Sequence, residues 1–264
     1  MKTIGITTNG VILHRLLEPL AKAGLNSLNI SLDTLIKEKF EFLTRRAAFT
    51  RVLSNIRLAL DMPEFYPLVK INCVVMQGIN TDELIDFVEL THNQSNLAVR
   101  FIEYMPFDDN QWNEKKYFPY QEMLKIIKQK YNLEKVPDDD RNDTTKWYRV
   151  RDASYQGKIG FITSMSEHFC STCNRIRLTA NGQLKVRIHL HEFCFFFPSS
   201  MNDLFQVCLF DNKEVSLLDA LRSGYTDEDI YALIQRTLYG KEKEHLPVDI
   251  LATKQNRPMI LIGG

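Results

Sequence analysis

The first hundred residues alternate between short apolar runs and amphipathic segments, and this alternation constrains the fold more than any other feature. Apolar runs that predict strands occur at 4–7, 28–32, 69–76 and 99–104. The segments between them carry apolar residues at helical spacing, and Gly24 is expected to end the first of these helices. Repeated strand–helix units of this length predict an α/β fold with a parallel sheet, either open or closed into a barrel.

The pattern changes after the fourth predicted strand. A helix is predicted at 120–131, and short strands and turns follow from Lys146 onward. We therefore divide the chain into a partial barrel at 1–112 and a smaller α+β domain at 113–264. Within the first part, Thr81 is expected to cap the helix that follows the third strand.

Charge and hydropathy exclude two classes of protein. Lys+Arg and Asp+Glu are both 33, so the net charge is zero, whereas nucleic-acid and membrane-surface binders need a sustained positive field. No apolar run approaches the roughly 20 residues that span a bilayer. We expect no nucleic-acid or membrane partner. The sequence starts within a predicted strand, which indicates that an amino-terminal portion is missing.

Polar and other functional side chains gather where the predicted strands end. In a parallel α/β barrel the functional site lies at the carboxyl ends of the strands. Hydroxyl, amide and ammonium groups at these positions suit a polar ligand with phosphates. Any one of them could equally be a satisfied buried polar group or a turn residue, and a methionine there could be core filler. The candidates are Thr7, Asn29, Ser31, Asp33, Lys70, Asn72, Arg100, Glu103 and Met105.

A second group of candidates surrounds a C-x-x-C motif. Cys170 and Cys173 form this motif, and Cys208 lies downstream. Three thiolates are one ligand short of a closed zinc or iron–sulfur site, and an open position at iron can bind a substrate. Arg175 and Arg177 alternate next to the motif, and arginine forks suit phosphate. On spacing alone, a structural zinc knuckle and a redox dithiol compete equally with an iron–sulfur centre.

Taken together, these segments resemble the GTP 3′,8-cyclases of molybdenum-cofactor biosynthesis, which are radical S-adenosylmethionine enzymes. The resemblance implies an α/β fold with a partial radical-SAM (β/α)6-type TIM-like barrel. A smaller α+β carboxy-terminal domain that carries an iron–sulfur site would follow. The matching segments keep the family's order and lie at 7–10, 29–33, 70–72, 100–105, 169–178, 208–210 and 257–264.

The resemblance also implies roles for the strand-end residues. Ser31 and Met105 would contact S-adenosylmethionine, with Arg100 nearby as a catalytic residue. The implied reaction abstracts hydrogen from the ribose of GTP and forms a carbon–carbon bond to the purine, giving 3′,8-cyclo-7,8-dihydro-GTP. A second protein, the cyclic pyranopterin monophosphate synthase, would consume that product. The implied GTP contacts are Thr7, Lys70, Arg175, Ile176 and Arg177.

The resemblance assigns the cysteines to a second cluster. Cys170, Cys173 and Cys208 would hold a [4Fe-4S] cluster whose open iron binds the guanine of GTP. Gly263 and Gly264 would reach into the active site and be needed for activity. The resemblance also implies a homodimer. Members of the family act in the mitochondrial matrix in eukaryotes or in the cytoplasm in bacteria.

The sequence departs from the family at its front. The C-x-x-x-C-x-x-C motif of the radical cluster does not occur in these 264 residues. Without those cysteines that cluster cannot form, so we expect this chain alone to lack cyclase activity. The alternative is a catalytically dead partial product that retains GTP and/or second-cluster binding. A zinc-stabilised aldolase-like barrel is a third possibility, and it would contain one zinc and no iron.

The second departure is an insertion between two of the cysteines. The spacing from Cys173 to Cys208 exceeds that of the family by a phenylalanine-rich segment of 21 residues, 186–206. Its ends can be encoded as a splice donor and an acceptor, and its removal would join Lys185 to Val207. We interpret the segment as an in-frame retained intron in a eukaryotic gene model, which favours a mitochondrial location. A lineage-specific surface loop is the alternative, although exposed loops rarely gather so many aromatic side chains.

Overall fold

The computed structural model describes residues 4–106, 113–137, 144–167, 177–178, 182–185 and 215–239. Two compact units share them. The first unit holds the described residues up to Met105 and from Asn113 to Glu167. The second unit holds Pro106 and the described residues from Arg177 onward.

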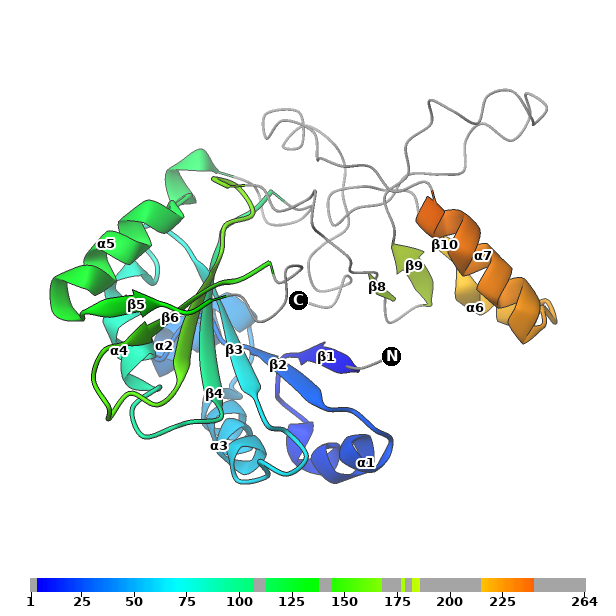
Figure 1. The fold of residues 1–264 in the computed structure, drawn as a ribbon, viewed down its shortest axis with the longest axis horizontal. Helices are drawn as coiled ribbons and strands as arrows, with labels where there is room; N and C mark the ends of the chain where they lie inside the picture. The colour runs from blue at the N-terminus through cyan, green and yellow to red at the C-terminus, as the bar shows by residue number, and fades with distance from the viewer. Residues whose placement is uncertain are drawn as a thin grey trace. The chain divides into compact units, whose positions relative to one another are not determined.

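The first unit is built on a mixed seven-stranded sheet (Figure 1). Its strand order is β1-β2-β3-β4-β7-β6-β5. Strands β1 to β4 and β7 are parallel, whereas β5, β6 and β7 pair antiparallel. The predicted α/β fold is therefore confirmed. The strands are β1 Gly5–Thr8, β2 Ser27–Ser31, β3 Val69–Val75, β4 Leu97–Glu103, β5 Leu133–Lys135, β6 Lys146–Val150 and β7 Lys158–Ile162.

The sheet continues across the boundary that the sequence pattern suggested between 112 and 113. Strand β7 pairs with β4 over Ala98 to Ile102, and β6 and β5 extend the sheet further. The structure thus places residues 113–137 and 144–167 in the first unit, which differs from the expected division. The reason is physical, because a bare β4 edge would leave its backbone N–H and C=O groups unpaired.

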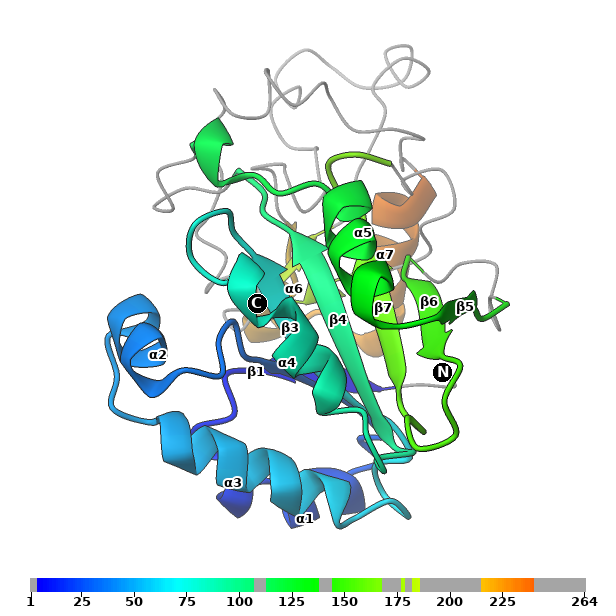
Figure 2. The ribbon, with the colours of Figure 1, turned by 90° about the vertical axis from the view of Figure 1, so that its left-hand side faces the viewer.

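The helices of the first unit lie along one face of the sheet (Figures 1 and 2). Their apolar residues recur at helical spacing, as Val52, Ile56 and Ala59 do in α3, and these side chains are buried against the strands. Three short 3₁₀ turns accompany the helices. The elements are η1 Leu13–Arg15, α1 Leu17–Lys22, α2 Lys37–Thr44, α3 Phe49–Leu60, η2 Thr81–Glu83, α4 Leu84–Glu89, η3 Glu114–Lys116 and α5 Tyr120–Lys130.

Strand β3 shows how the sheet separates its two faces. Val69, Ile71, Cys73 and Val75 are each at most 1% exposed and pack in the core under the helices. The residues between them, such as Lys70, are half-buried on the opposite face. We call this opposite face of β1–β4 and β7 the inner face. The register places the following residues on it: Thr7, Asn29, Ser31, Lys70, Asn72, Ala98, Arg100, Lys158 and Gly160.

A glycine on β7 lets neighbouring side chains approach the strand closely. Gly160 lies between Arg100 on β4 and Trp147 on β6. A Cβ atom at this position would lie 2.4 Å from Thr145 Cγ2 and 2.8 Å from Trp147 Cζ3. Because real Cβ atoms do not approach that closely, only glycine lets the Trp147 ring and the Thr145 methyl group lie this close to β7.

The second unit contains a three-stranded antiparallel sheet with the order β10-β9-β8 and two helices. Ser216 caps α6, because its Oγ accepts from the N–H of Asp219 at 3.0 Å. None of the described helices combines the length and apolar character that crossing a membrane requires. The elements are β8 Arg177–Leu178, β9 Gln183–Lys185, β10 Val215–Ser216, α6 Leu217–Arg222 and α7 Asp227–Tyr239.

Candidate functional site

The inner face brings six of the strand-end candidates together. Thr7 on β1 is in register with Asn29 on β2, which in turn is in register with Lys70 on β3. One step nearer the carboxyl ends, Ser31, Asn72 and Arg100 form a second row across β2, β3 and β4. Neighbouring strands are about 4.8 Å apart, so these side chains share one surface.

Arg100 is held on this face by two amide side chains. Its Nε donates to Asn72 Oδ1 at 2.9 Å, and its Nη2 donates to Asn29 Oδ1 at 2.7 Å. The residue is 7% exposed. The guanidinium therefore reaches from β4 across β3 to β2. We call the two amides the amide clamp.

The orientation of the Asn29 amide is itself fixed. Asn29 Nδ2 donates to the backbone oxygen of Ile6 on β1 at 3.0 Å. Since this bond occupies the amide nitrogen, the Asn29 oxygen faces Arg100, which is a pure donor. One hydrogen-bonded chain thus links the first four strands.

Lys70 is the second cation of the inner face. Its Nζ donates to Ser27 Oγ at 3.2 Å. The predicted hydroxyl contacts, Thr7 on β1 and Ser31 on β2, are half-buried. Two cationic side chains among hydroxyls and amides form a surface that suits an anionic, polar ligand.

Met105 follows β4 and is 4% exposed. The end of β4 is fixed by Glu103, whose side chain turns to the helix-covered face. Its carboxylate accepts from Tyr120 N at 2.9 Å and from Met165 N at 2.8 Å. Further donors are Tyr117 Oη, Ser166 N and Ser166 Oγ. Glu103 therefore ties β4 to the start of α5 and to the segment after β7, which is a structural role.

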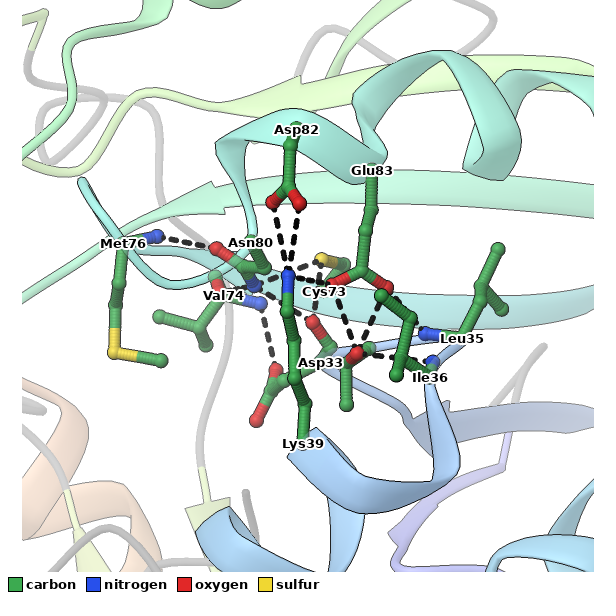
Figure 3. A network of polar contacts seen from close by, with 11 residues as sticks. Asp33, Leu35, Ile36, Lys39, Cys73, Val74, Met76, Asn80, Asp82 and Glu83 are labelled. Carbon is green, nitrogen blue, oxygen red and sulfur yellow. Dashed lines mark hydrogen bonds and ion pairs between the residues drawn. The ribbon is translucent and has the colours of Figure 1, made fainter.

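A polar network joins the carboxyl ends of β2 and β3 (Figure 3). Asn80 lies at its centre, because Nδ2 donates to the backbone oxygens of Asp33 at 2.6 Å and Val74 at 2.9 Å. Its Oδ1 accepts from Met76 N at 2.8 Å. The prediction that Thr81 caps the following helix is wrong. Thr81 is the first residue of the 3₁₀ turn η2, and Asn80 occupies the N-cap position of that turn.

A buried carboxylate completes this network. Glu83 is 1% exposed and accepts from Thr34 Oγ1 at 2.7 Å and Leu35 N at 2.6 Å. Lys39 Nζ donates to it at 2.9 Å. All of these bonds secure the turn after β2 to η2, so the carboxylate is structural.

Asp33 belongs to the same network, and the pKa of its carboxyl is raised. It follows Ser31 by two residues, and its Oδ1 accepts from Val74 N at 2.8 Å. Burial raises the pKa of the Asp33 carboxyl to about 6, against the opposing effect of the Val74 bond. Burial likewise raises the pKa of the Cys73 thiol, which lies in the core.

Comparison with known proteins assigns both parts of the chain. Residues 1–91 match the model of the Radical SAM superfamily, and residues 97–195 match the model named Molybdenum Cofactor Synthesis C. The GTP 3′,8-cyclase of Syntrophomonas wolfei is 38% identical over 262 residues, which are 99% of this chain and 72% of that protein. The chain belongs to the GTP 3′,8-cyclase family.

Eukaryotic members of the GTP 3′,8-cyclase family are also similar. The mitochondrial GTP 3′,8-cyclase of Arabidopsis thaliana is 44% identical over all of this chain, which covers 61% of that protein. Molybdenum cofactor biosynthesis protein 1 of Mus musculus is 49% identical over all of this chain. The chain spans 37% of the length of that mouse protein.

Several residues expected from the GTP 3′,8-cyclase resemblance lie outside the described part of the chain. The backbone of Arg177 is described in β8, but its side chain is not. Among the described residues, no group of three or more His, Cys, Asp or Glu side chains could hold a metal ion. The residues outside the description are Cys170, Cys173, Arg175, Ile176, Cys208, Gly263 and Gly264, together with the segment 186–206.

Sequence reasoning placed Asn29 and Asn72 among the strand-end candidates for a polar ligand, but the family resemblance assigned them no specific role. Their signal was present in the spacing, because each is separated by one residue from a predicted site residue on the same strand face, Ser31 and Lys70 respectively. What could not be read from spacing is that both amides converge on Arg100.

Proposed function

We propose that this chain contributes substrate and cofactor contacts to a GTP 3′,8-cyclase, which converts GTP to 3′,8-cyclo-7,8-dihydro-GTP in molybdenum-cofactor biosynthesis. The observation that carries the proposal is the inner face, where Arg100 and Lys70 lie among hydroxyls and amides on adjacent strands. The family membership supplies the reaction.

In this proposal the phosphates of GTP bind to the inner face. Lys70 provides a compact positive charge, and the Thr7 hydroxyl on β1 provides a hydrogen bond from the same row. The stretch Arg175 to Arg177 would contribute further GTP contacts. The family-model match over 97–195 supports this, because it includes that stretch.

S-adenosylmethionine would bind at the carboxyl ends of the strands, where Ser31 and Met105 lie. The residue types suit such a group, because the half-buried Ser31 hydroxyl ends β2 in the same row as Arg100, and the buried Met105 thioether follows β4. When bound with its cluster, this cofactor supplies the radical chemistry that activates the ribose of GTP. Residues of this chain would orient the two ligands and exclude water.

The proposed second cluster is a [4Fe-4S] centre held by Cys170, Cys173 and Cys208, with an open iron for the guanine. Gly263 and Gly264 would complete the active site. The finer fold would be a partial (β/α)6-type TIM-like barrel with an α+β carboxy-terminal domain. The product would pass to the cyclic pyranopterin monophosphate synthase. We further propose a homodimer. Its location would be the mitochondrial matrix if the source is a eukaryote, in line with the mitochondrial name of the Arabidopsis relative, and otherwise the cytoplasm.

We propose that this chain alone does not turn over GTP, because its sequence holds no C-x-x-x-C-x-x-C motif. A partial product that retains GTP and/or cluster binding is the second candidate. Titration calorimetry with GTP on the anaerobically reconstituted chain tests the substrate, with Lys70→Ala as the variant and the exposed Lys128→Ala as the control. Binding that Lys70→Ala weakens supports the proposal. A chain that binds no GTP contradicts it, and turnover by the isolated chain contradicts the inactivity.

A further inference from the structure

We propose that Asp33 is a further binding residue, whose carboxylate receives a positively charged group of S-adenosylmethionine at the carboxyl edge of the sheet. The charged group is the sulfonium or the ammonium of this ligand. The inference rests on the proposed function, because that function supplies a ligand with these two charges. Asp33 was a strand-end candidate to which the family resemblance assigned no role.

The position of Asp33 continues the inner face beyond the end of β2. Asp33 follows Ser31 by two residues, and the pairing with β3 continues between them, because Leu32 N donates to the backbone oxygen of Asn72 at 2.9 Å. The Asp33 Oδ1 atom then accepts from Val74 N at 2.8 Å. The carboxylate therefore lies beside Val74, in the row that follows Ser31 and Asn72 toward the carboxyl edge.

The rest of this row is apolar. Val74 on β3 is in register with Ile102 on β4, which in turn is in register with Ile162 on β7. Ile102 is 7% exposed, and the other two side chains are half-buried. Apolar side chains offer a carboxylate neither a hydrogen-bond donor nor a positive charge. Burial without such compensation is the reason that the pKa of Asp33 is raised to about 6.

Asp33 differs from the other buried carboxylates of the first unit in its number of donors. Glu83 accepts from a hydroxyl, a backbone N–H and Lys39 Nζ, and Glu103 accepts from five donors. Asp33 has one donor among the described residues, the N–H of Val74. Figure 3 shows its second carboxylate oxygen without a contact among the residues drawn. No lysine or arginine in the described part of the chain forms an ion pair with it.

The fold does not require the charge of Asp33. An asparagine would have nearly the same shape and would accept the same bond from Val74 N. The carboxylate lowers the stability of the fold, because it is removed from water without a cation beside it. Charges that are retained at a cost in stability are typical of ligand sites. A cationic group bound beside Asp33 would compensate the charge, whereas a phosphate of GTP would be repelled.

The test compares wild type and Asp33→Asn, in the full chain, with three adenosyl compounds of decreasing positive charge. S-adenosylmethionine carries a sulfonium and an ammonium, S-adenosylhomocysteine carries only the ammonium, and methylthioadenosine carries neither. Affinities are measured by calorimetry. We expect Asp33→Asn to weaken S-adenosylmethionine binding at least about tenfold, because a charge–charge contact is lost. The matched control is Asp86→Asn on α4, which changes the charge equally at an exposed site and should stay within about twofold.

The pH dependence of binding is a second readout. Wild-type affinity for S-adenosylmethionine should fall about tenfold from pH 7 to pH 5, because Asp33 binds a proton and loses its charge over this range. Asp33→Asn should show no such fall. The neighbouring titratable groups do not replace this effect. The Cys73 thiol has a raised pKa and stays neutral, and Glu83 is paired with Lys39.

The three probes separate the possible contacts. A loss confined to S-adenosylmethionine identifies the sulfonium, and a loss shared with S-adenosylhomocysteine but not with methylthioadenosine identifies the ammonium. An equal loss for all three probes, or no loss for any, would overturn the inference. Asp33→Ala should weaken binding as Asp33→Asn does, although it also removes the acceptor for Val74 N. A loss in the alanine variant alone would show a structural role and would likewise overturn the inference.

Binding of GTP to the same protein separates the inference from the proposed function. If the wild type binds GTP but none of the adenosyl probes, the inference fails and the proposed substrate stands. If the wild type binds S-adenosylmethionine, Asp33→Asn weakens that binding, and GTP does not bind, the proposed substrate fails alone. If neither GTP nor any adenosyl probe binds, both fail.

Discussion

The guanidinium of Arg100 donates to the side-chain oxygen of Asn29, two strands away in the sheet, at 2.7 Å. Both residues face the same side of the sheet, and Asn29 is itself bonded to the backbone of Ile6. This relationship makes the position of one cation depend on strands that are distant in sequence. It also makes several properties of the chain testable.

Replacement of Arg100 by lysine should separate charge from geometry. Arg100→Lys keeps the positive charge, but it cannot satisfy both amide oxygens, so we expect GTP affinity to fall about tenfold or more. Circular dichroism should show the fold retained. Arg57→Lys on the exposed side of α3 is the control and should bind as the wild type does. Unchanged affinity in Arg100→Lys would contradict a positioned guanidinium.

Neutralising Glu103 should destabilise the first unit. Glu103→Gln replaces an oxygen that accepts hydrogen bonds by an NH₂ group that faces donors such as Met165 N. We expect a loss of about 2–4 kcal/mol in the free energy of unfolding, because buried donors are left unsatisfied. Urea unfolding measures it, with the exposed Glu122→Gln as the reference. A loss below about 0.5 kcal/mol would show that Glu103 does not secure β4.

Asp33 should make stability fall as the pH rises. Its pKa is raised from the ordinary value of 3.8 to about 6 by burial, so between these values the folded state binds more protons than the unfolded state. The penalty is absent below about pH 4, grows through pH 6 and is complete above it. Asp33→Asn keeps an acceptor for Val74 N and removes the penalty.

The gain in unfolding free energy from Asp33→Asn should therefore be near zero at pH 4 and about 1–2 kcal/mol at pH 7, after allowance for the partial exposure of Asp33. Denaturant unfolding at several pH values measures the difference. The exposed Asp86→Asn variant on α4 serves as the comparison. A gain that does not change with pH would contradict the raised pKa.

Iron content tests the proposed second cluster. Protein reconstituted without oxygen should hold about four irons per chain, and Cys170→Ala should lose them. Cys73→Ala is the control, because Cys73 is 1% exposed in the core and should leave the iron unchanged. One zinc and no iron would favour the zinc-stabilised alternative. Protein with neither metal would mean that Cys208 does not reach the other two cysteines or that the fold is lost.

The origin of residues 186–206 is tested on RNA. We expect reads that run directly from the codon of Lys185 to the codon of Val207, because the segment is interpreted as a retained intron. Their absence, with reads continuous through the segment, would favour a lineage-specific loop.

Local patterns in the sequence were sufficient to predict the helices and strands, but they were insufficient to predict the contacts between these elements. The apolar run at 69–76 predicted β3, and the pattern at 120–131 predicted α5, because both signals depend on near neighbours. Thr81 was a wrong choice of cap, because the side chain of Asn80 before it serves the β2–β3 network. That use of Asn80 depends on residues 47 positions away.

The same limit applies to the site. The candidates Thr7, Ser31, Lys70 and Arg100 followed from strand-end positions, and the structure places them on one face. The amide clamp joins residues 71 and 28 positions apart, and only the sheet brings them together. The pairing of β7 with β4 was missed for the same reason, since strand pairing at long separation leaves no local pattern.

That pairing has a consequence for how the chain can be divided. The match to one family model ends at residue 91 and the match to the other begins at 97, where β4 starts. Yet β4 is the central strand of one sheet, with β3 on one edge and β7 on the other. Two sequence modules therefore share a single cooperative folding unit. Neither half could be expressed, exchanged or lost by recombination at this seam without stripping the other of its hydrogen-bonding partner.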